Sequence, residues 1–369
     1  MPRDPAPPPA RWADDATTLF ASPAWFEWWM EAFGGGEHGS WRPPHGAYAV
    51  PYVVRTRRAG GVPLRVAIGA ANAYTPQYDT CGEGVPAVPE LRRMLRDLRC
   101  AALELPFLAP QSRALRAASA GAARGANVVA TESAPQIDCS GDWDAYLASR
   151  SKSRRKEWRE KERALAATGA RLEVLATWSE IATRFEELLD VEASGWKGRN
   201  GSAIRQRPHA RRFFGLACPA LADAGKLRVL AIVRDGRTIA FKLCTLHGGR
   251  MSSLKTGYLD EFASQSPGQV LQLWTARWCF EQPDVKLFDF LSPSTPHKLA
   301  WATAVEPLHS LFVYGASLPG ALAWLRWSVG PRVRARVATR SRPGEAAGSA
   351  AGAARAASFS SPSRYTSAP

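Results

Sequence analysis

The run SQSPGQ at 264–269 is the part of the sequence best suited to hold a charged ligand. It precedes a segment expected to form a helix that stops at Pro283, and first-turn amides are unpaired at the positive end of a helix dipole. Gly268 would let a ligand approach the backbone closely. Ser266, Gly268 and Gln269 could therefore bind a pyrophosphate. The same residues also fit an ordinary capping box with proline at the first helical position, which needs no ligand.

The elements on either side of this run decide which groups can reach it. Alternating segments at 227–234 and 238–246 are joined by an Asp-Gly turn, and a third strand is expected at 251–258. A short apolar strand is expected at 285–291. A helix separates the last two strands, so the strand at 285–291 should run parallel to the one at 251–258. We expect an antiparallel meander, a helix whose start can bind a ligand, and a parallel strand.

The composition is that of a basic globular protein. The chain has 369 residues, 46% hydrophobic and 22% charged, with a formal net charge of +15. This balance favours anionic partners such as nucleic acid, a phosphorylated cofactor, a nucleotide-sugar or a lipid headgroup. Arginine- and alanine-rich coding also produces it without any such partner. The six cysteines stand singly with no CxxC pair, and no HExxH or GxSxG motif occurs, so neither a metal site nor a covalent serine mechanism is indicated.

Four runs, in order along the chain, resemble one known family. They are ANAYTPQYDT (71–80), EASGWKGRNGSAI (192–204), SPGQVL (266–271) and FDFLSPSTPHKLAWA (288–302). Together they are similar to the acetyltransferases associated with cellulose and exopolysaccharide biosynthesis (CelD/BcsL type), over roughly residues 20–315. That family lies in the wider group that includes the Fem-type aminoacyl transferases. The resemblance implies an α/β fold of tandem GNAT-like halves, each a mixed β-sheet flanked by helices, with the acyl-CoA site in the C-terminal half.

The resemblance also implies a place for the acyl donor, acetyl-CoA or another acyl-CoA. In GNAT folds the pantetheine arm lies where the strands before and after the phosphate-binding helix diverge, here 251–258 and 285–291. The phosphates would then face Ser266, Gly268 and Gln269. The usual Gln/Arg-x-x-Gly-x-Gly/Ala loop is reduced in this chain, and proline at position 267 removes one backbone donor.

Acyl transfer to an amine needs a proton acceptor and a stabilised oxyanion. A free alkylamine has a pKa near 10, so a base or a water relay must take its proton. Asp289 and Glu192 are the candidates; the alternative for Asp289 is that it caps a neighbouring backbone group or pairs with an arginine. Lys298 matches a lysine that in Fem-type motifs approaches the transferred acyl group, where a cation can stabilise the oxyanion. The alternative for Lys298 is a solvated side chain after a loop.

Three further residues are expected to shape the acceptor site. Trp196 and Lys197 follow Glu192 at a helix end, where a core tryptophan with an exposed neighbour is the alternative. His297 has a ring that titrates near neutrality and is a candidate proton shuttle, although packing or substrate contact is the preferred interpretation. With no covalent nucleophile in evidence, direct transfer in a ternary complex is preferred.

The chain divides into four expected regions. They are a disordered Pro-rich start (1–18), a degenerate GNAT-like domain (19–140), a GNAT-like acetyltransferase domain (141–315) and a basic low-complexity tail (316–369). The start contains no apolar run like a signal peptide, and the late apolar stretch at 318–329 is too short to span a bilayer, so we expect a cytoplasmic protein. The tail is a candidate for weak membrane-surface contact.

Three functions from different classes remain open. The first is acyl-CoA-dependent N- or O-acetyl transfer to a small or sugar-type acceptor, in polysaccharide or cell-envelope biosynthesis. The second is aminoacyl-tRNA-dependent transfer of the Fem type, which the charged helix expected at 152–167 would suit because phosphate contacts dominate RNA affinity. The third is a non-catalytic scaffold with a degraded cofactor loop. Nucleic acid is the less favoured partner, because aromatic residues beyond Trp158 are missing from that helix.

Overall fold

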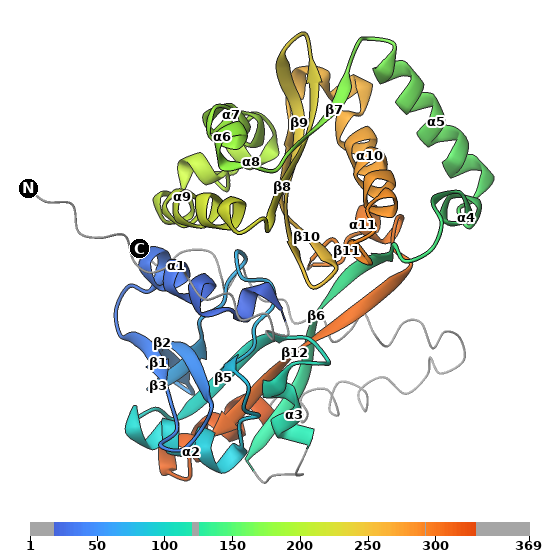
Figure 1. Ribbon diagram of the computed structural model, residues 1–369. Helices are drawn as coiled ribbons and strands as arrows, with labels where there is room; N and C mark the ends of the chain where they lie inside the picture. Colours follow the sequence, from blue (N-terminus) through green and yellow to red (C-terminus); the bar gives the residue numbers. More distant parts are fainter. Residues whose placement is uncertain (1–17, 120–124, 292, 330–369) are drawn as a thin grey trace, which may run out of the picture.

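One mixed β-sheet runs through the computed structural model, which describes residues 18–119, 125–291 and 293–329 (Figure 1). Over these residues the sheet has 12 strands in the order β1-β2-β3-β5-β12-β6-β11-β10-β9-β8-β7, with β4 paired to β2 outside this path. The Pro-rich start up to residue 17 and the tail from residue 330 lie outside the described residues. The strands are β1 (His38–Trp41), β2 (Tyr48–Ala59), β3 (Val62–Gly69), β4 (Cys81–Gly82), β5 (Ala102–Leu108), β6 (Ala126–Asp138), β7 (Arg171–Leu175), β8 (Leu227–Arg234), β9 (Arg237–His247), β10 (Arg250–Tyr258), β11 (Leu287–Asp289) and β12 (Ala304–Tyr314).

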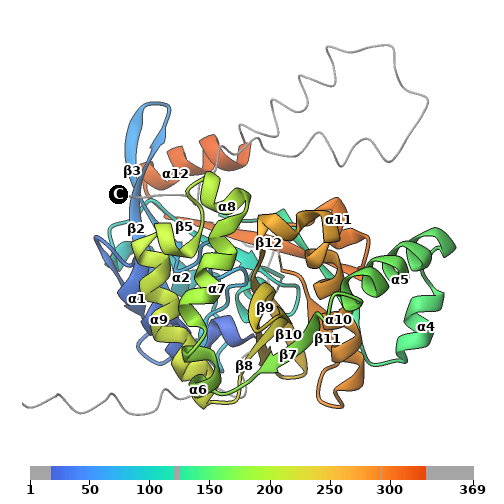
Figure 2. The same ribbon diagram turned by 90° about the horizontal axis from the view of Figure 1, so that it is seen from above.

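Helices cover both faces of the second half of the sheet. Figures 1 and 2 show α6, α7, α8 and α9 on one face of β8–β10, and α5 and α10 on the other. The helices are α1 (Pro23–Phe33), α2 (Val88–Asp97), α3 (Arg113–Ser119), α4 (Trp143–Ala148), α5 (Lys152–Ala166), α6 (Trp178–Ala182), α7 (Phe185–Ser194), α8 (Trp196–Arg199), α9 (Pro208–Asp223), α10 (Pro267–Glu281), α11 (Pro296–Leu299) and α12 (Leu318–Trp324). Shorter helical turns are Leu19–Ala21, Ile204–Gln206, Asp260–Gln265 and the π-helical Leu325–Val329.

Most elements expected from local pattern are present. The hydroxyl of Ser22 caps α1 by accepting a hydrogen bond from the Trp25 amide, with proline at the first helical position. The meander β8-β9-β10 and the parallel pairing of β10 with β11 are confirmed. The helix expected over 182–192 is present as α7, and a capping box of Thr177 and Glu180 begins an additional short helix before it, α6. The strand β12 was not expected.

The two halves of the chain repeat one pattern. In the first, β1, β2 and β3 form an antiparallel meander, α2 follows, and β5 returns parallel to β3. In the second, β8, β9 and β10 form the meander, α10 follows, and β11 returns parallel to β10. Each half is a mixed sheet with flanking helices, which confirms the fold class expected from the sequence.

The halves complete each other by exchanging their last strands. β6, from the first half, pairs with β11, while β12, from the end of the second half, pairs with β5. β6 and β12 also pair with one another along ten registered residue pairs and so join the halves into a single sheet. The domain boundary near residue 140 stays a prediction. β12 comes after this boundary in the sequence but pairs with two strands that come before it, β5 and β6.

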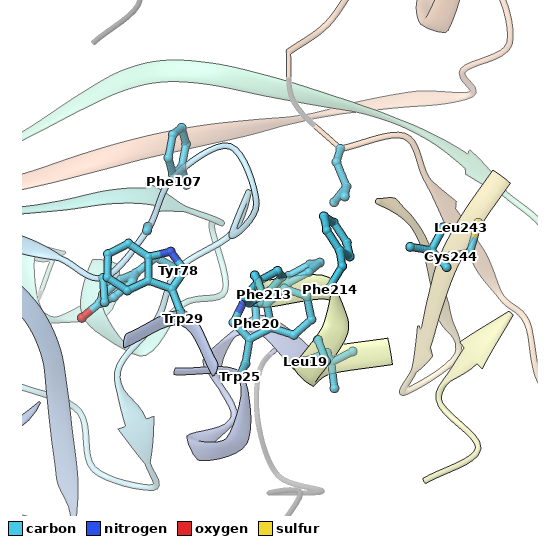
Figure 3. Packing of buried hydrophobic residues seen from close by; sticks show 14 of the residues in the cluster. Leu19, Phe20, Trp25, Trp29, Tyr78, Phe107, Phe213, Phe214, Leu243 and Cys244 are labelled. Atoms are coloured by element: carbon cyan, nitrogen blue, oxygen red, sulfur yellow. The ribbon is translucent and has the colours of Figure 1, made fainter. Parts of the chain in front are cut away.

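An aromatic core joins the first helix to the second half. Trp25 of α1 packs edge-on against Phe20 and against Phe213 of α9, with ring centroids 4.8 and 5.2 Å apart (Figure 3). Phe33, at the end of α1, also contacts Phe213. Burying such large rings is favourable in proportion to the apolar area removed from water. The position of α9, and through it of α7, is therefore tied to the first half of the chain.

The residues after 316 are helical where the structure describes them. α12 begins after Ser317, whose hydroxyl accepts a hydrogen bond from the Gly320 amide, and it continues into the π-helical Leu325–Val329. The basic low-complexity part of the expected tail lies outside the described residues. Across the described ranges, every helix is too short or too polar to cross a bilayer.

Candidate functional site

β10 and β11 separate in the middle of the sheet. They are paired in parallel only between residues 250–252 and 287–289, after which β11 ends and β10 continues to Tyr258. A register shift between Ser253 and Lys255 in the β9–β10 ladder marks a bulge, which bends β10 at the same level. Residues 253–258, which we call the divergence, have a strand partner on the β9 side alone. Their other edge offers backbone groups to a ligand that binds as an added strand.

The N-terminus of α10 lies at the end of this divergent strand. Ser266, just before the helix, adopts a left-handed conformation with φ of 53° and ψ of 45°, which is uncommon for a residue other than glycine. Its side chain makes no cap hydrogen bond, so the capping box that was the alternative interpretation is not formed. Instead the Gln269 side chain accepts a hydrogen bond from Nζ of Lys161 on α5, at 2.6 Å. The first turn of α10 is thus left without a side-chain cap.

Gly268 is in close contact with an aromatic ring. A Cβ at this position would lie 3.3 Å from Cδ1 and 3.6 Å from Cε1 of Tyr258, the last residue of β10. The Tyr258 side chain is 38% exposed and packs beside the amide face of the helix start. Because Gly268 has no side chain, the end of β10 can lie close to the first turn of α10, and a ligand between them can reach the backbone amides of that turn.

Lys298 is held by backbone carbonyls beyond the end of β11. Its Nζ donates to the carbonyl oxygens of Leu291 at 2.9 Å and Pro293 at 3.1 Å. Burial lowers the pKa of Lys298 to about 8. Burial and the positive charges of Lys242 and Lys298 lower the pKa of His297, so this ring favours its neutral form. The structure thus brings His297 and Lys298 together with the buried lysine of β9.

Asp289 is fully buried and accepts three hydrogen bonds. One oxygen accepts from Arg250 at 2.7 Å and from Nε2 of Gln77 at 3.1 Å, and the other accepts from the Leu291 amide at 2.7 Å. Burial raises the pKa of Asp289, and the charge of Arg250 opposes that rise. These contacts correspond to the alternative interpretation, in which the carboxylate caps the backbone and pairs with an arginine. Through Leu291, whose φ is 58°, Asp289 also fixes the carbonyl that holds Lys298.

We expect Asp289→Asn to destabilise the protein by about 1.5–3 kcal/mol, because it removes the buried carboxylate that accepts charge-assisted and backbone hydrogen bonds and is the nearest charge partner of the partly buried Arg250. Arg250 would retain Glu306, whose carboxylate lies 3.3 Å away. Urea unfolding of both proteins measures the change. The exposed ion pair of Arg212 with Glu31 supplies the control, since Glu31→Gln should cost at most about 1 kcal/mol. Equal effects of the two substitutions would contradict this account of Asp289.

Glu192 and Lys197 form a second cluster beside β10. The Glu192 side chain is fully buried; it accepts from Nζ of Lys197 at 3.3 Å and from the Ile204 amide at 2.8 Å, and lies 3.8 Å from Nζ of Lys255. Lys197 also donates to the carbonyl of Thr256, within the divergence, at 2.6 Å. The structure therefore places Lys197 against β10. Trp196 begins α8, and its side chain lies outside what the structure describes.

The site contains lysines that the sequence reasoning missed. Lys242 lies in the middle of β9, is 5% exposed and donates to Oε1 of Gln272 on α10. Lys255 lies on β10, with Nζ 4.5 Å from the centre of the Tyr74 ring. Burial lowers the pKa of both lysines to about 8. The signal in the sequence was a lysine inside an otherwise apolar strand, TIAFKLCTL at 238–246.

A concavity of about 320 Å³ lies apart from the divergence. It is lined by residues of α4, α5 and α10, among them Trp143, Trp158, Arg155 and Arg159, and by none from β10 or β11. In the described ranges no group of three or more His, Cys, Asp or Glu side chains is arranged to hold a metal ion.

The segment that contains the divergence matches a known family. Residues 152–299 fit the family model described as acetyltransferase (GNAT) domain. This segment is therefore similar to a GNAT domain. The matched residues include β8–β10, α10, β11 and Lys298. The geometry around Gly268 therefore belongs to the part of the chain that carries the GNAT likeness. No curated protein matches the sequence.

Solved structures share the fold over most of the chain. The C-terminal domain of a putative lysylphosphatidylglycerol synthetase from Agrobacterium fabrum has a TM-score of 0.53 at 13% identity, covering 82% of this chain and 91% of that one. L-PGS from Bacillus licheniformis has a TM-score of 0.51 at 12% identity, covering 83% and 96%. FemX has a TM-score of 0.51 at 12% identity, covering 84% and 94%. The likeness extends beyond the GNAT domain to both halves, and it concerns the fold.

Proposed function

We propose that the protein transfers an acyl group from an acyl-CoA thioester to a small or sugar-type acceptor. The observation that carries the proposal is the separation of β10 from β11 directly beside the uncapped N-terminus of α10. The free edge of residues 253–258 can pair with the amides of a pantetheine arm, and the first turn of α10 can receive the attached phosphates. The match of residues 152–299 to a GNAT domain supports this assignment.

The residues around the divergence supply the chemistry in this proposal. Lys298 directs its ammonium toward the oxyanion that forms when the acceptor attacks the thioester carbonyl. Glu192 takes the acceptor proton: its contacts with Lys197 at 3.3 Å and Lys255 at 3.8 Å are long, so an acceptor can replace them. Asp289, whose three hydrogen bonds come from within the protein, positions the Leu291 carbonyl that holds Lys298. His297 and the α8 residues border the acceptor.

The proposal is tested first by ligand-dependent stability. Acetyl-CoA should raise the melting temperature, because a ligand that binds only the folded state stabilises it by about 2.7 kcal/mol at a concentration of 100 times Kd. Differential scanning fluorimetry with acetyl-CoA, free CoA and uncharged tRNA measures the effect. A panel of acyl-CoAs and amino-sugars, assayed for released thiol, then identifies the donor and acceptor. A protein that responds to neither acetyl-CoA nor tRNA would be a scaffold rather than a transferase.

A second candidate is aminoacyl-tRNA-dependent transfer. The basic helix α5 favours it, together with the neighbouring concavity, whose lining includes Arg155, Arg159 and Trp143. Arginine and aromatic side chains in one groove are the groups that bind single-stranded nucleic acid. Stabilisation by tRNA that declines steeply with salt, without stabilisation by acetyl-CoA, would favour this candidate over the first.

The setting of the reaction is part of the same proposal. We place the protein in the cytoplasm, in polysaccharide or cell-envelope biosynthesis, with a weak contact of its C-terminal end to a membrane surface. Leu318, Trp324 and Leu325, in and just after α12, are 85%, 40% and 52% exposed, which supports such a contact.

A further inference from the structure

Lys242 is a buried lysine on the α10 side of the sheet. It lies opposite Thr256 in the β9–β10 ladder, at the level of the divergence. Its Nζ donates to Oε1 of Gln272 and lies 5.4 and 6.0 Å from the ring centres of Phe288 and Phe290. Gln272 follows Gly268 by four residues, so the two lie on the same side of α10, one turn apart. Lys242 therefore sits one helical turn behind the proposed phosphate-binding start.

The polar groups here are donors that lack acceptors. A lysine ammonium carries three N–H groups, and Lys242 donates one of them in a hydrogen bond to Oε1 of Gln272. Nε2 of Gln272 is buried and has no hydrogen-bond partner. The positive charge of Lys298 acts on Lys242 and helps to lower its pKa, and Lys298 donates two of its three N–H groups to backbone carbonyls. Buried polar groups in folded proteins are nearly always paired, so this cluster is short of acceptor oxygens.

The charge of Lys242 is also uncompensated. The titratable groups that act on it are Cys244, Cys279 and Lys298, and among the described residues no carboxylate pairs with it. Lys255, one strand away, has a side chain that is 15% exposed and lies 3.8 Å from the Glu192 carboxylate. A buried charge without a counterion costs free energy, and burial accordingly lowers the pKa of Lys242 to about 8. A lysine kept in such a position is suited to receive an anion from outside the chain.

We propose that Lys242 and Gln272 bind an oxyanion of the ligand, a phosphate or carboxylate oxygen that supplies the missing acceptor and the missing negative charge. The choice of ligand rests on the proposed function: the oxygen belongs either to the phosphates of the acyl donor or to a carboxylate on the acyl chain or acceptor. The anion chemistry itself rests on the donors alone. Lys242 and Gln272 are then further binding residues of the same site.

The test uses Lys242→Met in the full-length protein. If Lys242 serves binding, the substitution removes an unpaired buried charge, so the melting temperature without ligand should rise. Lys255→Met is the matched comparison, because it breaks a buried pair with Glu192 and should lower the melting temperature. A Lys242→Met protein that melts below the wild type, or fails to fold, would show that the lysine is structural and overturn the proposal.

The second measurement is the response to simple anions at constant ionic strength. Sodium pyrophosphate or sodium succinate should raise the melting temperature of the wild type, and Lys242→Met should lose that response while the exposed Lys286→Met keeps it. The anion that works tells the phosphate source from the carboxylate source. No shift with either anion in the wild type, or an unchanged shift in Lys242→Met, would overturn the proposal.

Failure of this inference is distinguishable from failure of the proposed function. If pyrophosphate or succinate stabilises the wild type through Lys242 but acetyl-CoA does not, the anion site stands and the acyl-CoA assignment fails. If acetyl-CoA stabilises the wild type and Lys242→Met equally, and neither anion acts through Lys242, the acyl-CoA assignment stands and the anion site fails.

Discussion

Replacing Gly268 by leucine is expected to abolish stabilisation by acetyl-CoA without unfolding the protein. The new Cβ would lie 3.3 Å from Cδ1 of Tyr258, and the rest of the side chain would occupy the space in front of the first turn of α10. Leucine is a better helix former than glycine by nearly 1 kcal/mol, which offsets the cost of displacing the partly exposed Tyr258 ring, so the unliganded variant should remain folded. Loss of the shift would then report lost binding. Differential scanning fluorimetry over a range of acetyl-CoA concentrations measures it.

Gly215→Leu is the matched control. Gly215 lies within α9, and a Cβ there would meet nothing within 4 Å, so the substitution makes the same chemical change on an open helix surface. This variant should keep the full response to acetyl-CoA. If Gly268→Leu also kept the wild-type response, the acyl donor would not use the start of α10.

Replacing Lys298 by methionine is expected to lower kcat by about 10²–10³-fold with little change in KM. Removing one donor to a developing oxyanion has effects of that size, and an interaction made in the transition state alone acts on kcat. Thiol release from acyl-CoA with the acceptor found in the panel measures it. Lys286→Met, the exposed lysine just before β11, should retain the wild-type kcat. A Lys298→Met kcat within twofold of the wild type would remove Lys298 from the chemistry.

The pH profile gives this prediction a second readout. The proposed role needs the charged ammonium, and the pKa of Lys298 is lowered to about 8, so kcat should fall as the pH rises through that value. Asp289 and Glu132 oppose the lowering of this pKa. A guanidinium stays charged throughout, so any activity kept by Lys298→Arg should show no such fall near pH 8. A fall of equal size in both proteins would assign the titration to another group.

The fold of the second half could be predicted largely from local sequence patterns. Alternation and turn residues predict β8, β9 and β10 from short stretches of sequence, and the helix that follows makes β11 parallel by topology alone. The exchange of β6 and β12 could not be predicted in this way. The partners of β12 lie about 170 to 210 residues away along the chain, and no local signal records such a pairing.

For the candidate site, the sequence likewise predicted which residues take part but not the geometry in which they meet. The residues of the run at 264–269 do meet the end of β10, but the left-handed backbone of Ser266 and the contact of Tyr258 with Gly268 depend on how the chain enters the helix. The hydrogen bond from Gln77 to Asp289 joins residues 212 positions apart and belongs to packing between the halves. Lys242 carried a signal, a charge within an apolar strand, yet its meaning rests on the missing counterion, which only the structure reveals.

The first half contrasts with the second at the corresponding place. Gly69 ends β3 there, and a Cβ on it would lie 2.9 Å from the ring of Tyr78. The Tyr78 amide donates to the Phe107 carbonyl of β5, and its hydroxyl donates to the Pro51 carbonyl. In the first half, therefore, the segment at Tyr78 pairs with β5, at the place that corresponds to the divergence of β10 and β11 in the second half. This difference supports placing the acyl donor in the second half alone.

A crystal structure with CoA would show directly whether the acyl donor binds between β10 and β11. We expect pantetheine amides paired with the edge of residues 253–258 that lacks a strand partner, and a diphosphate within hydrogen-bond distance of the amides at the start of α10. CoA bound elsewhere, with the edge of residues 253–258 covered by the protein's own side chains, would contradict this expectation.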